Sequence, residues 1–273
     1  MTDAFAAESA PRVNPLGYPG VWPTSSVLIT HDELRAVDSL EGVNLSARAP
    51  VLAIGSNAAP SQLRHKFAAV GLPFEIVSMS ARVSGYVSGF CGFAAPFGYV
   101  PATLVASPGA QSTMALQLLT DAQLTEIDAT EAPWYKRVWI ETEILLDTGD
   151  VLGGAYAYVA RGGYLADAAG PWLMHAPEDE LVVGGTHVPD QRSLLERLVA
   201  DPLLAEALGA HPEAVAARGA DPATSARAMR RAGVVCEVNP LYELPDEVGA
   251  TPRRAVVRAN ASVLEDVVVD PVE

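Results

Sequence analysis

The chain has 273 residues, of which 49% are hydrophobic, and its formal net charge is −15. This length and apolar content allow one large domain, or a compact domain with additions, and they argue against wholesale disorder. Because no dense run of Lys and Arg offsets the negative charge, the sequence excludes nucleic acid and anionic membranes as favourable partners.

The sequence predicts a cytoplasmic protein. No apolar run approaches the roughly 20 residues needed to span a bilayer, and Asp3 and Glu8 stand where a signal peptide needs basic residues. The two cysteines, Cys91 and Cys236, belong to no CxxC pair, so we expect neither a disulfide framework nor a zinc site.

Residues 1–48 are predicted to form an N-terminal arm. Prolines and glycines punctuate its first half, with prolines at positions 11, 15, 19 and 23. Because proline lacks a backbone donor and fixes φ, we expect that half to follow the surface without regular elements.

A strand, a polar turn and a helix follow the arm. Residues 50–54 are a short apolar run typical of a buried strand, which ends at Gly55. Residues 60–70 have helical spacing, and the proline that begins them suits a first helical turn.

The middle of the chain is predicted to consist mostly of strands. Residues 74–80 and 82–87 have strand-like apolar content, and residues 102–119 are typical of a hairpin with its turn at 107–109. Thr120 is a good N-cap for the helix that follows.

A second hairpin is predicted from residues 138–146 and 151–159, which alternate in polarity around a turn at 147–150. Many strands with few crossover helices favour a mixed sheet or a small barrel over a doubly wound fold.

Beyond residue 160 the pattern changes to helices. Residues 190–208 and 222–232 have helical spacing, and residues 255–269 are a valine-rich strand candidate before an acidic tip. This extension is either a helical appendage or an independent subdomain. The chain thus divides into the arm (1–48), a central domain (49–160) and a mainly helical C-terminal extension (161–273).

The turn at Ile54-Gly55-Ser56-Asn57 is the first candidate site. Glycine lets the backbone approach a ligand closely, and successive N–H groups at a helix start can hold a carboxylate or an oxyanion. The alternative is a plain strand-to-helix turn in which Ser56 or Asn57 caps the helix.

The second candidate is Glu131, which lies close in sequence to Trp134, Tyr135 and Trp139. An apolar, aromatic surround disfavours the charged form of a carboxyl group, as a proton shuttle near neutrality requires. The alternative is an exposed glutamate at a helix end.

Together these segments resemble the gamma-glutamyl cyclotransferases and their AIG2-like relatives. That family has a Tyr-Gly-Ser-Asn-Leu loop after a strand, a Leu-Thr-x-x-Gln-Leu-x-x-Leu-Asp helix, and a Glu followed by Tyr-x-Arg. This chain matches them in the same order at residues 54–58, at 119–128, and at Glu131 with Tyr135-Lys136-Arg137. Residues 101–109 also resemble a family stretch, and the resemblance covers about residues 50–160.

The resemblance implies an α+β fold, a small mixed-strand barrel of gamma-glutamyl cyclotransferase type, flanked here by the arm and the extension. It implies an enzyme that releases 5-oxoproline from a small-molecule gamma-glutamyl substrate, as an amide-cleaving lyase or an acyltransferase, without metal or organic cofactor. In that reaction the substrate's α-amine attacks its own γ-carbonyl. The leaving amine and the oligomeric state stay open.

The resemblance also implies roles for individual residues. Glu131 is the catalytic acid/base, which takes the proton of the α-amine and returns it to the leaving nitrogen. Tyr135 and Arg137 contact the substrate. The glutamyl carboxylate or the oxyanion is held by the loop residues Ile54, Gly55, Ser56, Asn57 and Ala58.

Two positions depart from the family pattern, since Ile54 replaces the loop tyrosine and Ala58 replaces the loop leucine. If the tyrosine hydroxyl orients the substrate, that contact is missing here. A second hypothesis therefore stands beside the enzyme: a non-catalytic small-molecule binding protein that retains the fold and the carboxylate pocket.

Overall fold

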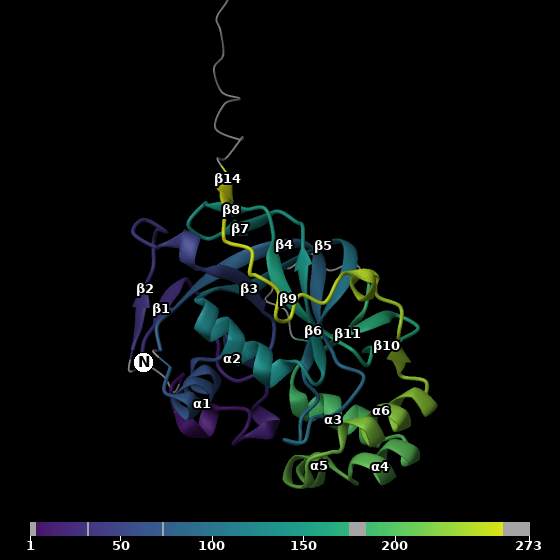
Figure 1. The fold of residues 1–273 in the computed structure, drawn as a ribbon. Coiled ribbons are helices and arrows are strands. Elements are labelled where there is room, and N and C mark those ends of the chain that lie inside the picture. Colours follow the sequence, from purple (N-terminus) through teal and green to yellow (C-terminus); the bar gives the residue numbers. More distant parts are fainter. Residues whose placement is uncertain (1–3, 32, 73, 175–183, 259–273) are drawn as a thin grey trace, which may run out of the picture.

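The computed structural model describes residues 4–31, 33–72, 74–174 and 184–258 (Figure 1). The strands are β1 (Val27–Ile29), β2 (Leu34–Ala36), β3 (Ala49–Ala53), β4 (Ile76–Phe90), β5 (Ala102–Leu119), β6 (Tyr135–Ile140), β7 (Ile144–Leu146), β8 (Val151–Leu152), β9 (Ala155–Ala160), β10 (Tyr164–Asp167), β11 (Gly170–Met174), β12 (Thr186–Val188), β13 (Val235–Cys236) and β14 (Val257–Arg258). The helices are α1 (Pro60–Val70), α2 (Asp121–Glu131), α3 (Gln191–Val199), α4 (Pro202–Leu208), α5 (Pro212–Arg218) and α6 (Pro222–Arg231).

The strands form one curled mixed sheet, which confirms the predicted α+β barrel-like fold. Its main path runs β13-β10-β11-β4-β5-β3-β9-β6, and the remaining strands pair at its sides. Most pairs are antiparallel, whereas β3 runs parallel to β9 and β12 parallel to β11. No helix in the described part of the chain is long and apolar enough to cross a membrane.

The predicted hairpin within residues 102–119 is wrong, because these residues form the single strand β5. Both of its halves pair with β4, with Ser84 opposite Gln111 and Tyr86 opposite Ala106. Residues 107–110 are therefore extra residues in one strand, and they form a bulge where a turn was expected. The two apolar runs at 74–80 and 82–87 likewise belong to one strand, β4.

The strand–turn–helix prediction at residues 50–70 is confirmed. All five residues of β3 are buried, because the strand lies between β5 and β9. The helix α1 begins at Pro60 and ends at Val70, before Gly71 in the left-handed conformation, with φ +67°.

Helix α2 begins as predicted at Thr120. The Thr120 side chain accepts the N–H of Gln123 at 3.3 Å, and the Gln123 side chain accepts the N–H of Thr120 at 2.9 Å. This capping box satisfies two backbone donors that a helix start leaves without partners. The second predicted hairpin is also present, as β6 pairs with β9, and β7 with β8 around residues 147–150.

The arm and the extension both pack on the central sheet. Residues 4–24 form short 3₁₀ turns, but the second half of the arm contributes β1 to the sheet beside β4. In Figure 1 helices α3 to α6 gather at one end of the sheet, and they share a hydrophobic cluster with residues of the sheet such as Phe90 and Ala102. The extension and the sheet thus share part of one hydrophobic core. The predicted helix at 190–208 is two helices, α3 and α4, and most of the predicted strand at 255–269, with the acidic tip, lies outside the described residues.

A buried ion pair joins four segments of the fold. Arg137 on β6 is 1% exposed, and its guanidinium donates to Asp128 of α2 at 2.5 Å. The hydroxyl of Tyr158 on β9 donates to the other oxygen of that carboxylate at 2.6 Å, and the carbonyl of Glu247 accepts from the same guanidinium. Burial raises the pKa of Asp128, while the bonds from Tyr158 and Arg137 oppose that shift.

Loss of the Arg137 charge is expected to destabilise the protein strongly. Arg137→Met leaves the Asp128 carboxylate buried without a counter-charge, which costs about 3–5 kcal/mol in the free energy of unfolding. The double variant Arg137→Met/Asp128→Leu is expected to recover part of this loss. Urea denaturation measures both.

Arg35→Met serves as the control, because Arg35 pairs with Glu33 on the exposed surface. Equal unfolding free energies for Arg137→Met and Arg35→Met would show that the buried pair contributes nothing to stability.

Candidate functional site

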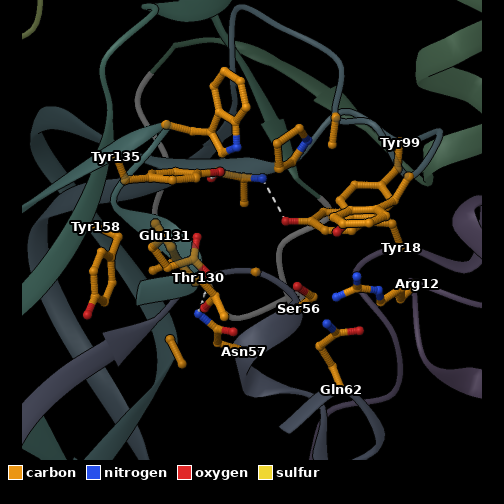
Figure 2. A pocket seen from close by; sticks show the side chains of 18 of the residues that line it. Arg12, Tyr18, Ser56, Asn57, Gln62, Tyr99, Thr130, Glu131, Tyr135 and Tyr158 are labelled. Carbon is orange, nitrogen blue, oxygen red and sulfur yellow. Dashed lines mark hydrogen bonds between the residues drawn. The ribbon is translucent and has the colours of Figure 1, made fainter. Parts of the chain in front are cut away.

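A cavity of about 280 Å³ opens at the end of β3 (Figure 2). Its floor is the loop at residues 54–57, and one side is the C-terminal end of α2 with the start of β6. The opposite side is aromatic and comes from the arm and from residues 93–102. Both candidate sites from the sequence therefore lie at one cavity.

The loop after β3 is a 3₁₀ turn. The N–H of Ala58 donates to the carbonyl of Gly55 and that of Ala59 to the carbonyl of Ser56, both at 3.0 Å. The N–H groups of Ser56 and Asn57 stand at the start of this turn, where a helix offers no acceptor, and none of the described residues accepts from them. Neither side chain caps α1, whose N-cap is Ala59 without a side-chain bond.

Glu131 contacts the loop directly. Its Oε1 accepts from the Asn57 side-chain amide at 3.2 Å and from Nζ of Lys66 at 2.7 Å. Lys66 also donates to Oδ1 of Asn57 at 2.8 Å and to the hydroxyl of Thr130 at 3.0 Å. Oε2 of Glu131 has no hydrogen bond with any described residue. One oxygen is therefore anchored, and the other is left for a ligand.

The surroundings of Glu131 are more polar than the sequence predicts. Its side chain is 17% exposed and ion-paired with Lys66, whose side chain is 8% exposed. Of the three aromatic residues expected around it, Trp134 and Tyr135 line the cavity, whereas Trp139 packs on Tyr156 outside it.

Lys66 is a site residue that the sequence analysis did not single out. It is one of only two lysines, with Lys136, among 18 basic residues in an arginine-rich chain. A rare residue type in the helix directly after the loop was the available signal. An ammonium group donates in three directions, and here it ties α1, the loop and α2 together.

Four buried tyrosines surround the carboxylate: Tyr18, Tyr99, Tyr135 and Tyr158. Burial raises the pKa of each hydroxyl, and the negative charge of Glu131 adds to the shift. All four phenols therefore keep their protons near neutrality and are able to donate a hydrogen bond.

The other expected contact residues are placed differently. Tyr135 lines the cavity, but its hydroxyl donates to the carbonyl of Ala102 at 2.9 Å. Arg137 does not line the cavity, because it is buried against Asp128. Ile54 lines the cavity, whereas Ala58 is fully buried beneath the loop. The assignment of Arg137 and Ala58 to substrate contact is thus corrected.

Two residues of the arm line the cavity and were not predicted. Tyr18 stacks on Tyr99, with ring centroids 4.6 Å apart. Arg12 is exposed, with its guanidinium 4.3 Å from the ring centroid of Phe97. No carboxylate of the described residues forms an ion pair with Arg12, so its charge is available to a ligand. Within the described ranges, no group of three or more His, Cys, Asp or Glu side chains is arranged to hold a metal ion.

No protein family model matches the chain, and no curated protein matches it significantly. Among solved structures, a gamma-glutamyl cyclotransferase is 16% identical, with a TM-score of 0.34 over 41% of this chain and 66% of its own. A protein of Arabidopsis thaliana is 19% identical, with a TM-score of 0.32 over 41% of this chain and 62% of its own. An uncharacterized protein of Homo sapiens is 18% identical, with a TM-score of 0.33 over 42% and 67%. The chain thus covers less than two thirds of the gamma-glutamyl cyclotransferase and of the Arabidopsis thaliana protein.

Loss of Lys66 is expected to destabilise the site. Lys66→Met leaves the largely buried Glu131 carboxylate without its counter-charge, at a cost of about 3 kcal/mol in the free energy of unfolding. The double variant Lys66→Met/Glu131→Gln is expected to recover part of the lost stability, because it no longer contains the unpaired carboxylate. Chemical denaturation of both variants measures the coupling.

Arg64→Met is the matched control, since Arg64 lies on the same helix and forms no ion pair with the described residues. If Lys66→Met proves as stable as Arg64→Met, the Lys66–Glu131 pair does not anchor the site.

Proposed function

We propose that the chain is a gamma-glutamyl cyclotransferase-like enzyme, which releases 5-oxoproline from a gamma-glutamyl amide. The observation that carries the proposal is the contact between Glu131 and Asn57, 74 residues apart in the sequence, at the floor of one cavity. The two motifs that suggested the activity therefore meet at one cavity. The motif order along residues 50–160 supports the same activity.

The reaction is an intramolecular acyl transfer. The α-amine of the substrate attacks the γ-carbonyl carbon, a C–N bond forms, and the π electrons of the carbonyl move to its oxygen. When the carbonyl re-forms, the original amide C–N bond breaks and the leaving amine departs. The products are 5-oxoproline and an amine, and no water is consumed.

Glu131 carries the proton between the two nitrogens. Its free Oε2 takes the proton of the attacking amine and returns it to the leaving nitrogen. Lys66 and Asn57 hold Oε1, so the carboxylate keeps one orientation throughout the reaction. A fold that holds the substrate chain bent restricts its bond rotations before the attack, which lowers the entropic part of the barrier.

The backbone amides of the loop are placed to stabilise negative charge on the substrate. The N–H groups of Ser56 and Asn57, at the floor of the cavity, have no acceptor among the described residues and are suited to a carboxylate or to the oxyanion of the tetrahedral intermediate. Donors that are fixed before the reaction stabilise the transition state without reorganisation.

Glu131→Gln is expected to lower kcat for 5-oxoproline release at least about 100-fold, because an amide cannot accept the proton. The glutamine oxygen still accepts from Lys66, so the fold is expected to persist. The assay follows 5-oxoproline released from a panel of gamma-glutamyl dipeptides and gamma-glutamylamines.

Glu126→Gln is the control, as Glu126 lies on the same helix outside the cavity. Unchanged release by Glu131→Gln would rule out this mechanism. Binding of panel compounds without any turnover would favour the rival hypothesis, a binding protein that retains the pocket.

Arg12 is expected to favour substrates whose leaving part bears a carboxylate, because it lines the cavity and pairs with no carboxylate in the part of the chain that the structure describes. Arg12→Gln should raise KM for gamma-glutamyl dipeptides about two- to fivefold, the range of an exposed charge pair. KM for uncharged gamma-glutamylamines should stay unchanged, and added salt should reduce the difference. Equal effects on both substrate classes would contradict this role.

A further inference from the structure

The hydroxyl of Tyr18 is a polar group of the cavity that the mechanism above does not use. Tyr18 belongs to the arm and is 5% exposed. Its oxygen accepts the N–H of Ala102 at 2.6 Å, which fixes it in the cavity wall. In Figure 2 this oxygen points from the aromatic side of the cavity toward the side that carries Glu131.

The loop at residues 54–57 lies directly against the same oxygen. A Cβ atom on Gly55 would stand 2.4 Å from the Tyr18 hydroxyl oxygen and 3.1 Å from Cβ of Ala102. The φ of Gly55 is −144°, so this glycine is required for space and not for a left-handed backbone. The hydroxyl therefore lies beside Gly55, the residue that directly precedes Ser56 and Asn57 in the loop.

The proton of the Tyr18 hydroxyl has no acceptor among the described residues. Its neighbours are already engaged, since Tyr99 interacts with Ser56 and Tyr135 donates to the carbonyl of Ala102. Burial raises the pKa of Tyr18 well above its ordinary value, so the proton is present throughout the neutral range. A buried donor without an acceptor is costly, and a ligand oxygen at this place removes that cost.

We propose that Tyr18 is a catalytic residue, which donates a hydrogen bond to the γ-carbonyl oxygen of the substrate together with the loop amides. The inference rests on the proposed function, because it adds a donor to that reaction. As the amine attacks, the electron pair moves to this oxygen and the bond from Tyr18 strengthens. When the carbonyl re-forms, the pair returns and the leaving nitrogen receives its proton from Glu131. Tyr18 itself neither gains nor loses a proton.

The first test is Tyr18→Phe, which keeps the stacked ring and removes the donor. Removal of one oxyanion donor is expected to lower kcat about 100-fold, with KM changed less than about threefold. Tyr164→Phe is the matched control, because Tyr164 is a buried tyrosine outside the cavity whose hydroxyl donates to the carbonyl of Val238 at 3.3 Å. Thermal unfolding and the stoichiometry of 5-oxoproline binding report the folded, competent fraction of each variant.

The second test displaces the hydroxyl without removing it. Gly55→Ala places a methyl group where the Tyr18 oxygen lies, so it is expected to lower kcat to a similar extent. In the Tyr18→Phe background the clash with the hydroxyl is gone and only the 3.1 Å contact with Cβ of Ala102 remains, so Gly55→Ala should cost less than about a further threefold. A loss of structure alone would instead make the two effects multiply.

Each outcome decides the proposal. A folded Tyr18→Phe with kcat within threefold of wild type overturns it and leaves the proposed function standing, and multiplying effects in the double variant overturn it as well. If Tyr18→Phe does not fold, Gly55→Ala decides alone, and wild-type kcat in that variant overturns the role. Failure of the wild type to release 5-oxoproline from any panel compound overturns both the proposed function and this inference.

Discussion

Arg137 carries a positive charge into the interior of the protein, and three other segments are arranged to receive it. Asp128 of α2 supplies the counter-charge, Tyr158 of β9 binds the second carboxylate oxygen, and the main chain at Glu247 closes the remaining side. The ring of Tyr156 covers the guanidinium, 4.6 Å from its centroid. A buried charge is tolerated only where such partners surround it, so this pair fixes where α2 ends relative to the sheet.

The position of the α2 end determines the site. Thr130 and Glu131 follow Asp128 by less than one helical turn, and both receive hydrogen bonds from Lys66 of α1. Lys66 also donates to Asn57, which lies in the loop directly before α1. A chain of polar contacts therefore connects the buried ion pair to the floor of the cavity. Each member holds the next in one orientation, as a site that works by positioning requires.

Elements governed by local rules could be predicted from the sequence. Pro60 at a helix start, the capping box at Thr120 and the fully apolar strand β3 depend on neighbours within a few residues. The hairpin prediction is wrong for β5 because Pro108 and Gly109 are compatible with both a turn and a bulge. Only the pairing with β4, which is distant in sequence, decides between the two.

The site was predictable to the extent that it follows a motif. Glu131 and the loop residues Gly55, Ser56 and Asn57 line the cavity as the motif order indicated. Arg137 matched the motif too, yet its partner is Asp128 within the core, which a pattern of residue types does not reveal. Lys66 and Tyr18 were missed because their contacts, to Glu131 and Ala102, span 65 and 84 residues.

These long separations have a consequence for biosynthesis. On the ribosome, Tyr18 emerges well before Ala102, which lies 84 residues later, and Arg137 emerges before Glu247, 110 residues later. Contacts between distant parts of a chain form only after the later part is available. The nascent protein therefore contains the loop at residues 54–57 and Glu131 before Glu247 is available to bind Arg137. All residues that line the cavity have been synthesised once Tyr158 is added, whereas Glu247, which accepts from the buried Arg137, follows later.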